Sequence, residues 1–437
     1  MLRSAIILAC LSSVAILPGE AAQRAQQAPP SSAIDRSRAD VDDFPSTIAT
    51  DWFELLYDVV RTEKTTPPPA SRNYALTAVA LYEAIVPGTR DNRSLVGQLN
   101  DLTVLPQADK QKLHWPTVAN SVLARTIRGL YPSLSQASTE AIDELEADIA
   151  SQQQATVPPP VYERSVEQAR AVADAILNWA ASDGFATYNN CAYAPAEVTG
   201  AWQPTPPTFN PNPLQPCWGL IRPMVLTSGQ ECAPAGPPAF STDPSSDFYG
   251  AAREVYDTNL HLTDEQKAIA NHWADNPGVS GTPPGHWIAI VSQIAELDGL
   301  SLGAAAEAYV RVGLAVNDAF IVCWNAKYLY NLQRPVTYVN DHIDATWSPY
   351  LVTPVFPTYI SGHSTQSSAA ARVLTDMFGI KSFTDQARSF DSFDSAAAEA
   401  ALSRLYAGIH FSFDNDDGIT SGRCVGDTIT QRVSFQN

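Results

Sequence analysis

Basic residues are scarce in this 437-residue sequence. Lysine and arginine together number 27 against 46 aspartates and glutamates, which gives a formal net charge of -19. Nucleic-acid phosphates and anionic lipid surfaces repel a chain of this charge, so neither is an expected partner. The chain also lacks a Cys-x-x-Cys pair and a His-Glu-x-x-His motif, which leaves a zinc ribbon, a dithiol redox site and a zinc-protease site without support.

Long apolar runs are missing beyond residue 22, so we expect no membrane-spanning helix there. Residues 1–22 combine a basic start at Arg3, a short apolar run and small residues at a plausible cleavage site, which predicts a secretory signal peptide and a secreted or periplasmic protein. A membrane anchor is the alternative, but the run is shorter than the ~20 residues that span a bilayer. A lipoprotein attached through Cys10 ranks lower, because few apolar residues precede it.

Five cysteines remain after the leader. Cys191, Cys217 and Cys232 share one proline-rich region, and an export compartment permits disulfides, so we expect two of the three to pair. The spacing does not say which two. The odd count leaves at least one free thiol, and Cys323, within an apolar stretch, is expected to be buried and inert.

Alternating strand patterns are nearly absent, whereas apolar residues recur with helical spacing along most of the chain. The sequence therefore predicts an all-α protein. The expected helices fall near 48–60, 74–85, 114–130, 134–153, 163–182, 262–275, 286–297, 301–333, 364–378, 394–406 and 415–433.

Prolines interrupt this pattern at 184–248 and predict a long ordered excursion over the surface. No composition shift divides the rest into independent domains. We expect a flexible arm at 23–45 and a single helical domain at 46–437, made of an N-terminal half (46–183), the excursion and a catalytic half (249–437).

Lys327 and Arg334 stand out because they lie seven residues apart in a largely apolar stretch that ends at Pro335. If one helix carries both, seven steps of about 100° return to nearly the same face, so both cations point one way. The alternative is that both side chains reach solvent along an apolar wall.

A second pattern is Ser361-Gly362-His363, at the start of an alanine-rich helical stretch. The first turn of a helix exposes unpaired backbone N–H groups, and glycine permits close approach, so this turn can seat an anion. His363 can act as an acid or a base. Taken alone, the pattern favours an ordinary helix cap over an anion site.

The third pattern combines Arg404, His410 and Asp414. An unbroken helix would put Arg404 and His410 on different faces, but Gly408 can end the helix and let both reach one point. Asp414 can then orient the imidazole of His410 through its second ring nitrogen.

Together these patterns reproduce Lys-x6-Arg-Pro, Pro-Ser-Gly-His and Ser-Arg-x5-His-x3-Asp, except that Ile360 stands where the second motif usually has proline. In this the sequence resembles the superfamily that unites type 2 phosphatidic acid phosphatases with vanadium-dependent haloperoxidases, over about residues 270–437. The resemblance implies two four-helix-bundle-like halves. It also implies the chloroperoxidase-like, soluble bacterial type of haloperoxidase, since no spanning helix follows the leader.

The resemblance implies a role for each matched residue. Vanadate is the implied cofactor, and phosphate suits the same site. His410 would bond to the central atom, His363 would be the acid–base group, and Lys327 would also polarise a bound oxygen. The oxygens would be bound by Lys327, Arg334, Ser361, Gly362 and Arg404.

Trp324 and Phe356 match positions that line the halide site in chloroperoxidase-like members, although plain core aromatics are the alternative. The implied reaction oxidises a halide with hydrogen peroxide to hypohalous acid, and an organic molecule can be the acceptor. A secreted acid phosphatase and a non-catalytic phosphate- or vanadate-binding protein remain alternatives. The sequence predicts neither the oligomeric state nor a firm choice between chloride and bromide.

Three further histidines, His272, His286 and His342, fall in no recognised ligand spacing, so we interpret them as ordinary hydrogen-bonded residues. Asp275 is expected to pair with an active-site arginine, as an acidic residue of this region does in members of the superfamily.

Overall fold

The computed structural model of the protein describes residues 39–437 apart from 109–112, 195 and 197. The predicted signal peptide and residues 23–38 of the predicted arm lie outside the described residues. Residues 39–45, the last part of the predicted arm, are among the described residues. The short 3-10 helix η2 (Val41–Asp43) is capped by Asp40, and Val41 is buried in the core, which holds the segment in place.

Five helices of the N-terminal half lie close to the predicted ranges. The helices are α1 (Thr47–Thr62), α2 (Pro67–Ile85), α3 (Trp115–Leu130), α4 (Gln136–Gln154) and α5 (Pro159–Ala181). Three consecutive prolines begin α2 instead of breaking the chain before it, because the first turn of a helix needs no N–H from its residues. Short helices η3 (Val86–Gly88), α6 (Phe185–Tyr188) and η5 (Trp218–Leu220) complete this part.

The C-terminal half contains two helices that the sequence analysis missed, α7 (Asp247–Leu260) and α11 (Pro335–His342). The other helices are α8 (Asp264–His272), α9 (Thr282–Leu297), α10 (Leu302–Tyr330), α12 (Gly362–Phe378), α13 (Phe393–Tyr406) and α14 (Ser412–Arg432). An unpredicted hairpin pairs β1 (Phe383–Asp385) with β2 (Arg388–Phe390) in antiparallel register, Phe383 opposite Phe390. None of the described helices is long and apolar enough to cross a bilayer.

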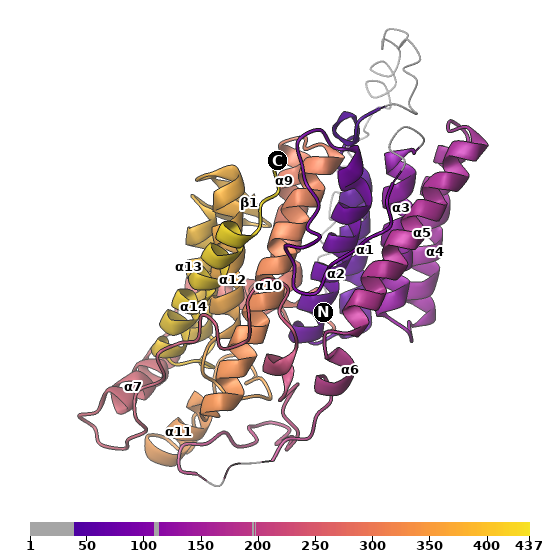
Figure 1. Ribbon diagram of the computed structural model, residues 1–437. Helices are drawn as coiled ribbons and strands as arrows, with labels where there is room; N and C mark the ends of the chain where they lie inside the picture. The colour runs from indigo at the N-terminus through magenta and orange to yellow at the C-terminus, as the bar shows by residue number, and fades with distance from the viewer. Residues whose placement is uncertain (1–38, 109–112, 195, 197) are drawn as a thin grey trace, which may run out of the picture. The chain divides into compact units, whose positions relative to one another are not determined.

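The long helix α10 lies between two groups of helices (Figure 1). On one side it packs against α1, α2 and α9, and on the other side against α12 and α14. Most of its residues are buried, as expected for a helix that is apolar on every side. The all-α prediction is confirmed for the described residues.

Three glycines set the spacing between α12 and α14. Gly418, Gly422 and Gly426 recur every four residues, so they lie on one face of α14. A Cβ atom on Gly422 would lie 2.1 Å from the carbonyl oxygen of Thr365. The two helices can therefore approach this closely only because these positions carry no side chain.

The proline-rich excursion is anchored to α10 by one buried carboxylate. Asp318 accepts hydrogen bonds of 2.8–2.9 Å from the backbone N–H groups of Met224, Val225 and Leu226. Farther along α10, Trp324 and Tyr328 donate side-chain hydrogen bonds to the carbonyl of Leu214. These contacts fix an otherwise irregular segment against the helix that carries Lys327.

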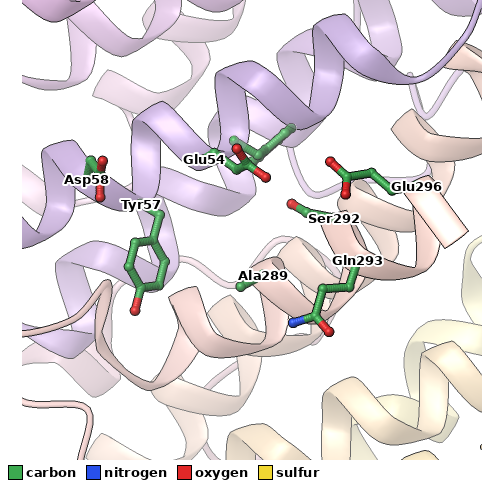
Figure 2. Close-up of a pocket in the computed structure, with 8 residues that line it drawn as sticks. Glu54, Tyr57, Asp58, Ala289, Ser292, Gln293 and Glu296 are labelled. Carbon is green, nitrogen blue, oxygen red and sulfur yellow. The ribbon is translucent and has the colours of Figure 1, made fainter. Parts of the chain in front are cut away.

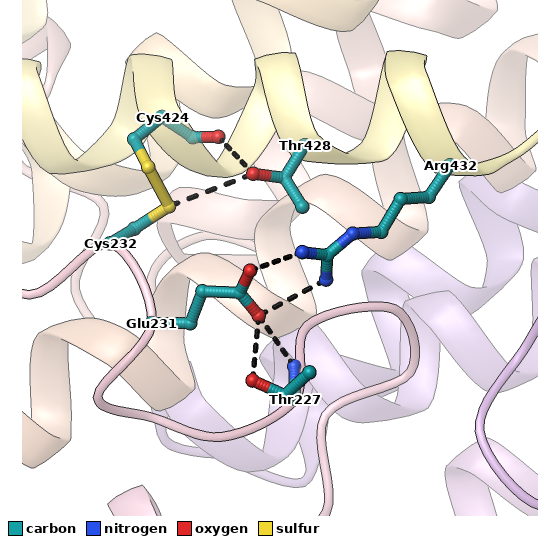
Figure 3. Close-up of a disulfide and its surroundings, with 6 residues drawn as sticks. All are labelled: Thr227, Glu231, Cys232, Cys424, Thr428 and Arg432. Carbon is teal, nitrogen blue, oxygen red and sulfur yellow. Dashed lines mark hydrogen bonds and ion pairs between the residues drawn. A yellow bond between two sulfur atoms is a disulfide. The ribbon is translucent and has the colours of Figure 1, made fainter.

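Two disulfides restrain the same excursion. Cys191 pairs with Cys217, which confirms that two of the three clustered cysteines are bonded. Cys232 pairs with Cys424 of α14, a partner 192 residues away that sequence spacing does not reveal. Figure 3 shows this bond beside the ion pair of Glu231 with Arg432, so the excursion is tied to α14 twice. Cys323 is free and buried, as expected.

We predict that Gly422→Ala lowers the free energy of unfolding by about 2 kcal/mol, because its methyl group would overlap the Thr365 carbonyl and force α12 and α14 apart. Urea unfolding followed by circular dichroism measures the change. Gly250→Ala in α7 is the matched control: nothing lies within 4 Å of its added Cβ, so we expect it to stabilise by about 0.5–1 kcal/mol. Equal effects of both substitutions would contradict this account of the helix spacing.

Candidate active site

A cavity of about 450 Å³ opens where the segment that follows α8 meets α10, α12 and α13. Its wall contains most of the residues that the sequence patterns selected: Asp275, Trp324, Phe356, Gly362, His363, Arg404 and His410. Its other side is apolar, lined by Pro67, Leu214, Pro277, Leu351, Val352 and Pro354. Lys327, Arg334 and Ser361 are fully buried behind this wall.

The ammonium group of Lys327 holds the turn that precedes α12. Its Nζ donates to the carbonyls of Pro357, Thr358 and Ile360 at 3.0, 2.8 and 2.6 Å. All three N–H groups are engaged in this way, so Lys327 contributes its charge and the shape of the turn. It also lies 5.0 Å from the ring centre of Phe356, one of the cavity aromatics.

Arg334 does not lie on the helix that carries Lys327, which corrects the expectation of one continuous helix. α10 ends at Tyr330, and Asn331 adopts the left-handed conformation that terminates many helices. Arg334 is the extended N-cap of α11, as the following proline requires. Its guanidinium donates to the carbonyls of Phe356 and Ile409 at 2.8 Å each, while its Nη2 atom is buried without a hydrogen-bond partner.

His410 is fixed by Asp414 through one ring nitrogen. Nδ1 lies 2.9 Å from the Asp414 carboxylate, and Nε2 lies 3.2 Å from Nη1 of Arg334. The same carboxylate accepts hydrogen bonds from the backbone of Phe411 and from the Thr358 hydroxyl. A proton on Nδ1 therefore leaves the Nε2 lone pair on the other side of the ring, next to Nη1 of Arg334. His410 also lines the cavity.

Thr358 is a site residue that the sequence reasoning missed. Its hydroxyl bonds to Asp414 and approaches Nδ1 of His410 at 3.2 Å. A single threonine inside a proline-rich turn has no periodicity or spacing that would select it.

His363 and Ser361 lie at the start of α12. Ser361 is the N-cap, and its hydroxyl accepts a 3.4 Å hydrogen bond from the N–H of Ser364, so the ordinary capping role is present. The first-turn N–H groups of Gly362 and His363 then have no partner within the helix. The His363 ring donates to the carbonyl of Trp273, and its Nε2 atom is buried without a partner.

Arg404 enters the cavity from the last turn of α13. Its Nε donates to the Ser403 hydroxyl at 2.9 Å and its Nη2 to the Ala270 carbonyl at 3.3 Å. Gly408, with a φ of 76°, then turns the chain so that His410 reaches the same cavity. The Asp275 carboxylate makes its ion pair with His286, so the expected direct pairing with Arg404 is not formed. The charge of Asp275 still acts on Arg404 and raises its pKa, against the lowering by burial.

Four basic side chains, those of Lys327, Arg334, Arg404 and His410, are buried here with one principal counter-charge, Asp414. His363 is partly buried beside them. Burial lowers the pKa of Lys327, and it lowers those of Arg334 and Arg404 to about 9 and about 10. Burial and the neighbouring cations hold the pKa values of His363 and His410 well below their usual range. Burial also raises the pKa of Asp414.

A bound oxoanion would complete this site. It would accept from the unpartnered Nη2 of Arg334 and the first-turn N–H groups of α12, and it would offset the charges that burial destabilises. The residues present therefore fit a tetrahedral anion, with Nε2 of His410 as the donor for its central atom.

A second cavity, of about 320 Å³, lies between α1 and α9 and has the opposite charge. Figure 2 shows the carboxylates of Glu54 and Glu296 directed toward the space between these helices. Burial and the charge of Glu296 raise the pKa of Glu54. This cavity contains none of the predicted site residues, and an anion would be repelled from it.

Comparison with known proteins identifies similar folds. A family model for the second helical-bundle domain of VCPO matches residues 339–436. A solved bacterial vanadium-dependent iodoperoxidase superposes with a TM-score of 0.83 and 33% identity, covering 90% of this chain and 98% of that chain. The holo form of a bacterial vanadium-dependent chloroperoxidase superposes at 0.64 with 15% identity over 85% and 95% of the two chains, which shows a shared fold alone. No curated protein matches the sequence.

We predict that Arg404→Gln raises the dissociation constant for inorganic phosphate by about 10- to 100-fold, because one charged donor at the cavity wall is lost. Isothermal titration calorimetry on the metal-free protein measures it. Arg253→Gln on the exposed side of α7 removes the same charge far from any cavity wall and serves as the control. Equal affinities of the two variants would place the anion elsewhere.

Anion binding is also expected to depend on pH. The lowered pKa values of Arg334 and Arg404 rise when an anion offsets their burial, so binding takes up protons and affinity falls as pH rises through about 9 and above. Sulfate is the suitable probe, since its charge is constant over this range. Calorimetry in two buffers of different ionisation enthalpy measures the uptake, and proton release on binding would contradict the assignment.

Proposed function

The chain belongs to the vanadium-dependent haloperoxidase family, and from that premise we propose that it oxidises a halide with hydrogen peroxide at the cavity lined by α10, α12, α13 and the segment after α8. The observation that carries this proposal is the buried excess of basic groups around a cavity, with an unpartnered Arg334 donor and an unpartnered His363 nitrogen. In the overall reaction, halide, hydrogen peroxide and a proton yield hypohalous acid and water, so the halide is oxidised and the peroxide reduced.

Vanadate is the cofactor that the family implies, and the donor set fits it. His410 would supply the nitrogen ligand, while Arg334, Arg404 and the N–H groups of Gly362 and His363 would hold the oxygens. Lys327 keeps the turn before α12 in shape and adds a third cationic charge. When bound, vanadate supplies Lewis-acid activation of hydrogen peroxide. Phosphate has the same shape and charge type, so we propose that it competes for the site.

His363 is the proposed acid–base group. It lines the cavity, its ring is held by the Trp273 carbonyl, and its Nε2 has no partner. Because burial and the nearby cations lower its pKa, the imidazole is neutral before an anion binds and can accept a proton from peroxide at Nε2. A bound anion stabilises the resulting imidazolium, which can then return the proton to the leaving oxygen.

Trp324 and Phe356 form the proposed halide pocket. Their ring centres lie 5.0 Å apart on the cavity wall, and Nζ of Lys327 lies 5.7 and 5.0 Å from them. Aromatic walls next to a buried cation suit a large, weakly hydrated anion. The similar iodoperoxidase makes iodide the first halide to test, whereas Phe356 alone suggested chloroperoxidase-like character.

We also propose that the protein is exported. The disulfides Cys191–Cys217 and Cys232–Cys424 support this, because such bonds persist mainly in oxidising compartments.

Vanadate-loaded protein is expected to oxidise iodide, and bromide by halogenation of a phenolic dye, when peroxide is present. His363→Ala should lower kcat by about 100-fold because the acid–base group is lost, and His410→Ala should abolish activity because vanadate is no longer held. His261→Ala, on the exposed end of α7, is the control and should keep wild-type activity.

A chromogenic phosphate ester should be tested in parallel with the metal-free protein. Wild-type halide oxidation by the His410→Ala variant or by the vanadate-free protein would refute the proposed function. Efficient ester hydrolysis without halide oxidation would favour an acid phosphatase of the same fold.

A further inference from the structure

The C-terminal end of α8 holds two side chains of the active site through its backbone. The Ala270 carbonyl accepts from Nη2 of Arg404 at 3.3 Å. The Trp273 carbonyl accepts from the His363 ring. Both acceptors belong to one short stretch of chain, so whatever fixes this stretch also fixes the direction of a cavity cation and of the acid–base histidine.

His286 of α9 makes several of the contacts that fix this stretch. Its ring stacks on the Trp273 indole, with centres 4.4 Å apart and planes at 18°. Its Nδ1 lies 2.9 Å from the Asp275 carboxylate, which follows α8 and lines the cavity. The Trp273 indole donates in addition to Glu399 of α13 at 3.1 Å.

The other nitrogen of His286 binds a second carboxylate. Nε2 lies 2.6 Å from Oδ2 of Asp385 in β1, while Gln293 donates to the other oxygen at 3.1 Å. The side chains of Asp275, His286 and Asp385 are only 6%, 4% and 2% exposed. An ionised carboxylate can only accept hydrogen bonds, so two ionised carboxylates, one on each ring nitrogen, require both nitrogens to carry protons.

Charge explains why an imidazolium is stable here. Burial alone would lower the pKa of His286, but the two carboxylates raise it to about 10. Burial alone would raise the pKa of Asp385, but the imidazoles of His272 and His286 hold it well below its usual range. The charges of His286 and Asp385 therefore stabilise each other.

We propose that His286 is a positioning residue for the oxoanion site: as an imidazolium between Asp275 and Asp385, it locks the end of α8 against α9 and β1 and so holds Arg404 and His363 toward the cavity. We call the three side chains the His286 clamp. The proposal rests on the proposed function only in taking an oxoanion as the ligand. Without the central cation, two buried carboxylates would repel each other, and Asp275 would present an uncompensated negative charge to the cavity.

A divalent metal ion is the competing interpretation. His272, His286 and Asp385 place one ligand atom each within 4.8 Å of one another. However, the 2.6 Å between Nε2 of His286 and Oδ2 of Asp385 is a hydrogen-bond distance. Two ligands of a tetrahedral zinc ion, with bonds of about 2.0–2.1 Å, lie about 3.3 Å apart. The geometry therefore favours a proton over a metal ion between them.

The test measures binding of inorganic vanadate to the full-length, vanadate-free protein by isothermal titration calorimetry. We expect His286→Gln to raise the dissociation constant about tenfold, because it removes the positive charge and frees Asp275. The double variant His286→Gln with Asp385→Asn restores the total charge of the clamp, and its dissociation constant should return to within about threefold of wild type. His261→Gln, an exposed histidine of α7, is the matched control and should bind like wild type.

Nitrogen-15 NMR of histidine-labelled protein provides a second readout that a packing role would not produce. His286 should show two protonated ring nitrogens at pH 8. A neutral ring, wild-type affinity of a folded His286→Gln variant, or no recovery in the double variant would overturn the proposal. So would one equivalent of a divalent metal in the purified protein that His286→Gln and Asp385→Asn each remove.

The two proposals fail in different ways. Tight vanadate binding that depends on the clamp but supports no halide oxidation would refute the proposed function and leave the clamp standing. Halide oxidation with unchanged vanadate affinity in the His286→Gln variant would refute the clamp and leave the function standing.

Discussion

The active-site half of this protein is organised by buried positive charge that the protein itself does not neutralise. Lys327, Arg334 and Arg404 are withdrawn from water, and Asp414 is the principal carboxylate among them. Such a cluster is unfavourable in isolation, because burial penalises every ion without a close partner. An anion from solution would provide the missing charge, so affinity for that anion and destabilisation of the empty site would have one cause.

The helical frame supplies the rigidity that this arrangement needs. α10 carries Lys327 and contacts both groups of helices, α12 presents His363, and α14 carries Asp414 behind His410. Each functional side chain is at or near a helix end, where backbone groups are free to bind ligands or to orient side chains. The excursion, held by Asp318, closes the space beside Trp324 with Leu214.

Much of this could be predicted from the sequence. Helical spacing predicts the all-α class, and three short patterns select residues that lie at one cavity wall or are buried behind it. The sequence patterns do not predict features that depend on contacts between distant parts of the chain or on a local break in a helix. Arg334 lies beyond a helix end that a left-handed Asn331 creates, and Cys232 finds a partner in α14. The His286 clamp depends on a hairpin that brings Asp385 to α9, and no spacing along the chain encodes that meeting.

The glycine face of α14 limits which stabilising mutations the active site can tolerate. Replacing glycine by alanine inside helices is a common way to make an enzyme more thermostable. On this face the same exchange would displace the helix that carries Asp414 behind His410, because the gap between α12 and α14 has no room for a methyl group. Directed evolution of this scaffold should therefore leave positions 418, 422 and 426 untouched and draw its robustness from exposed helices such as α7.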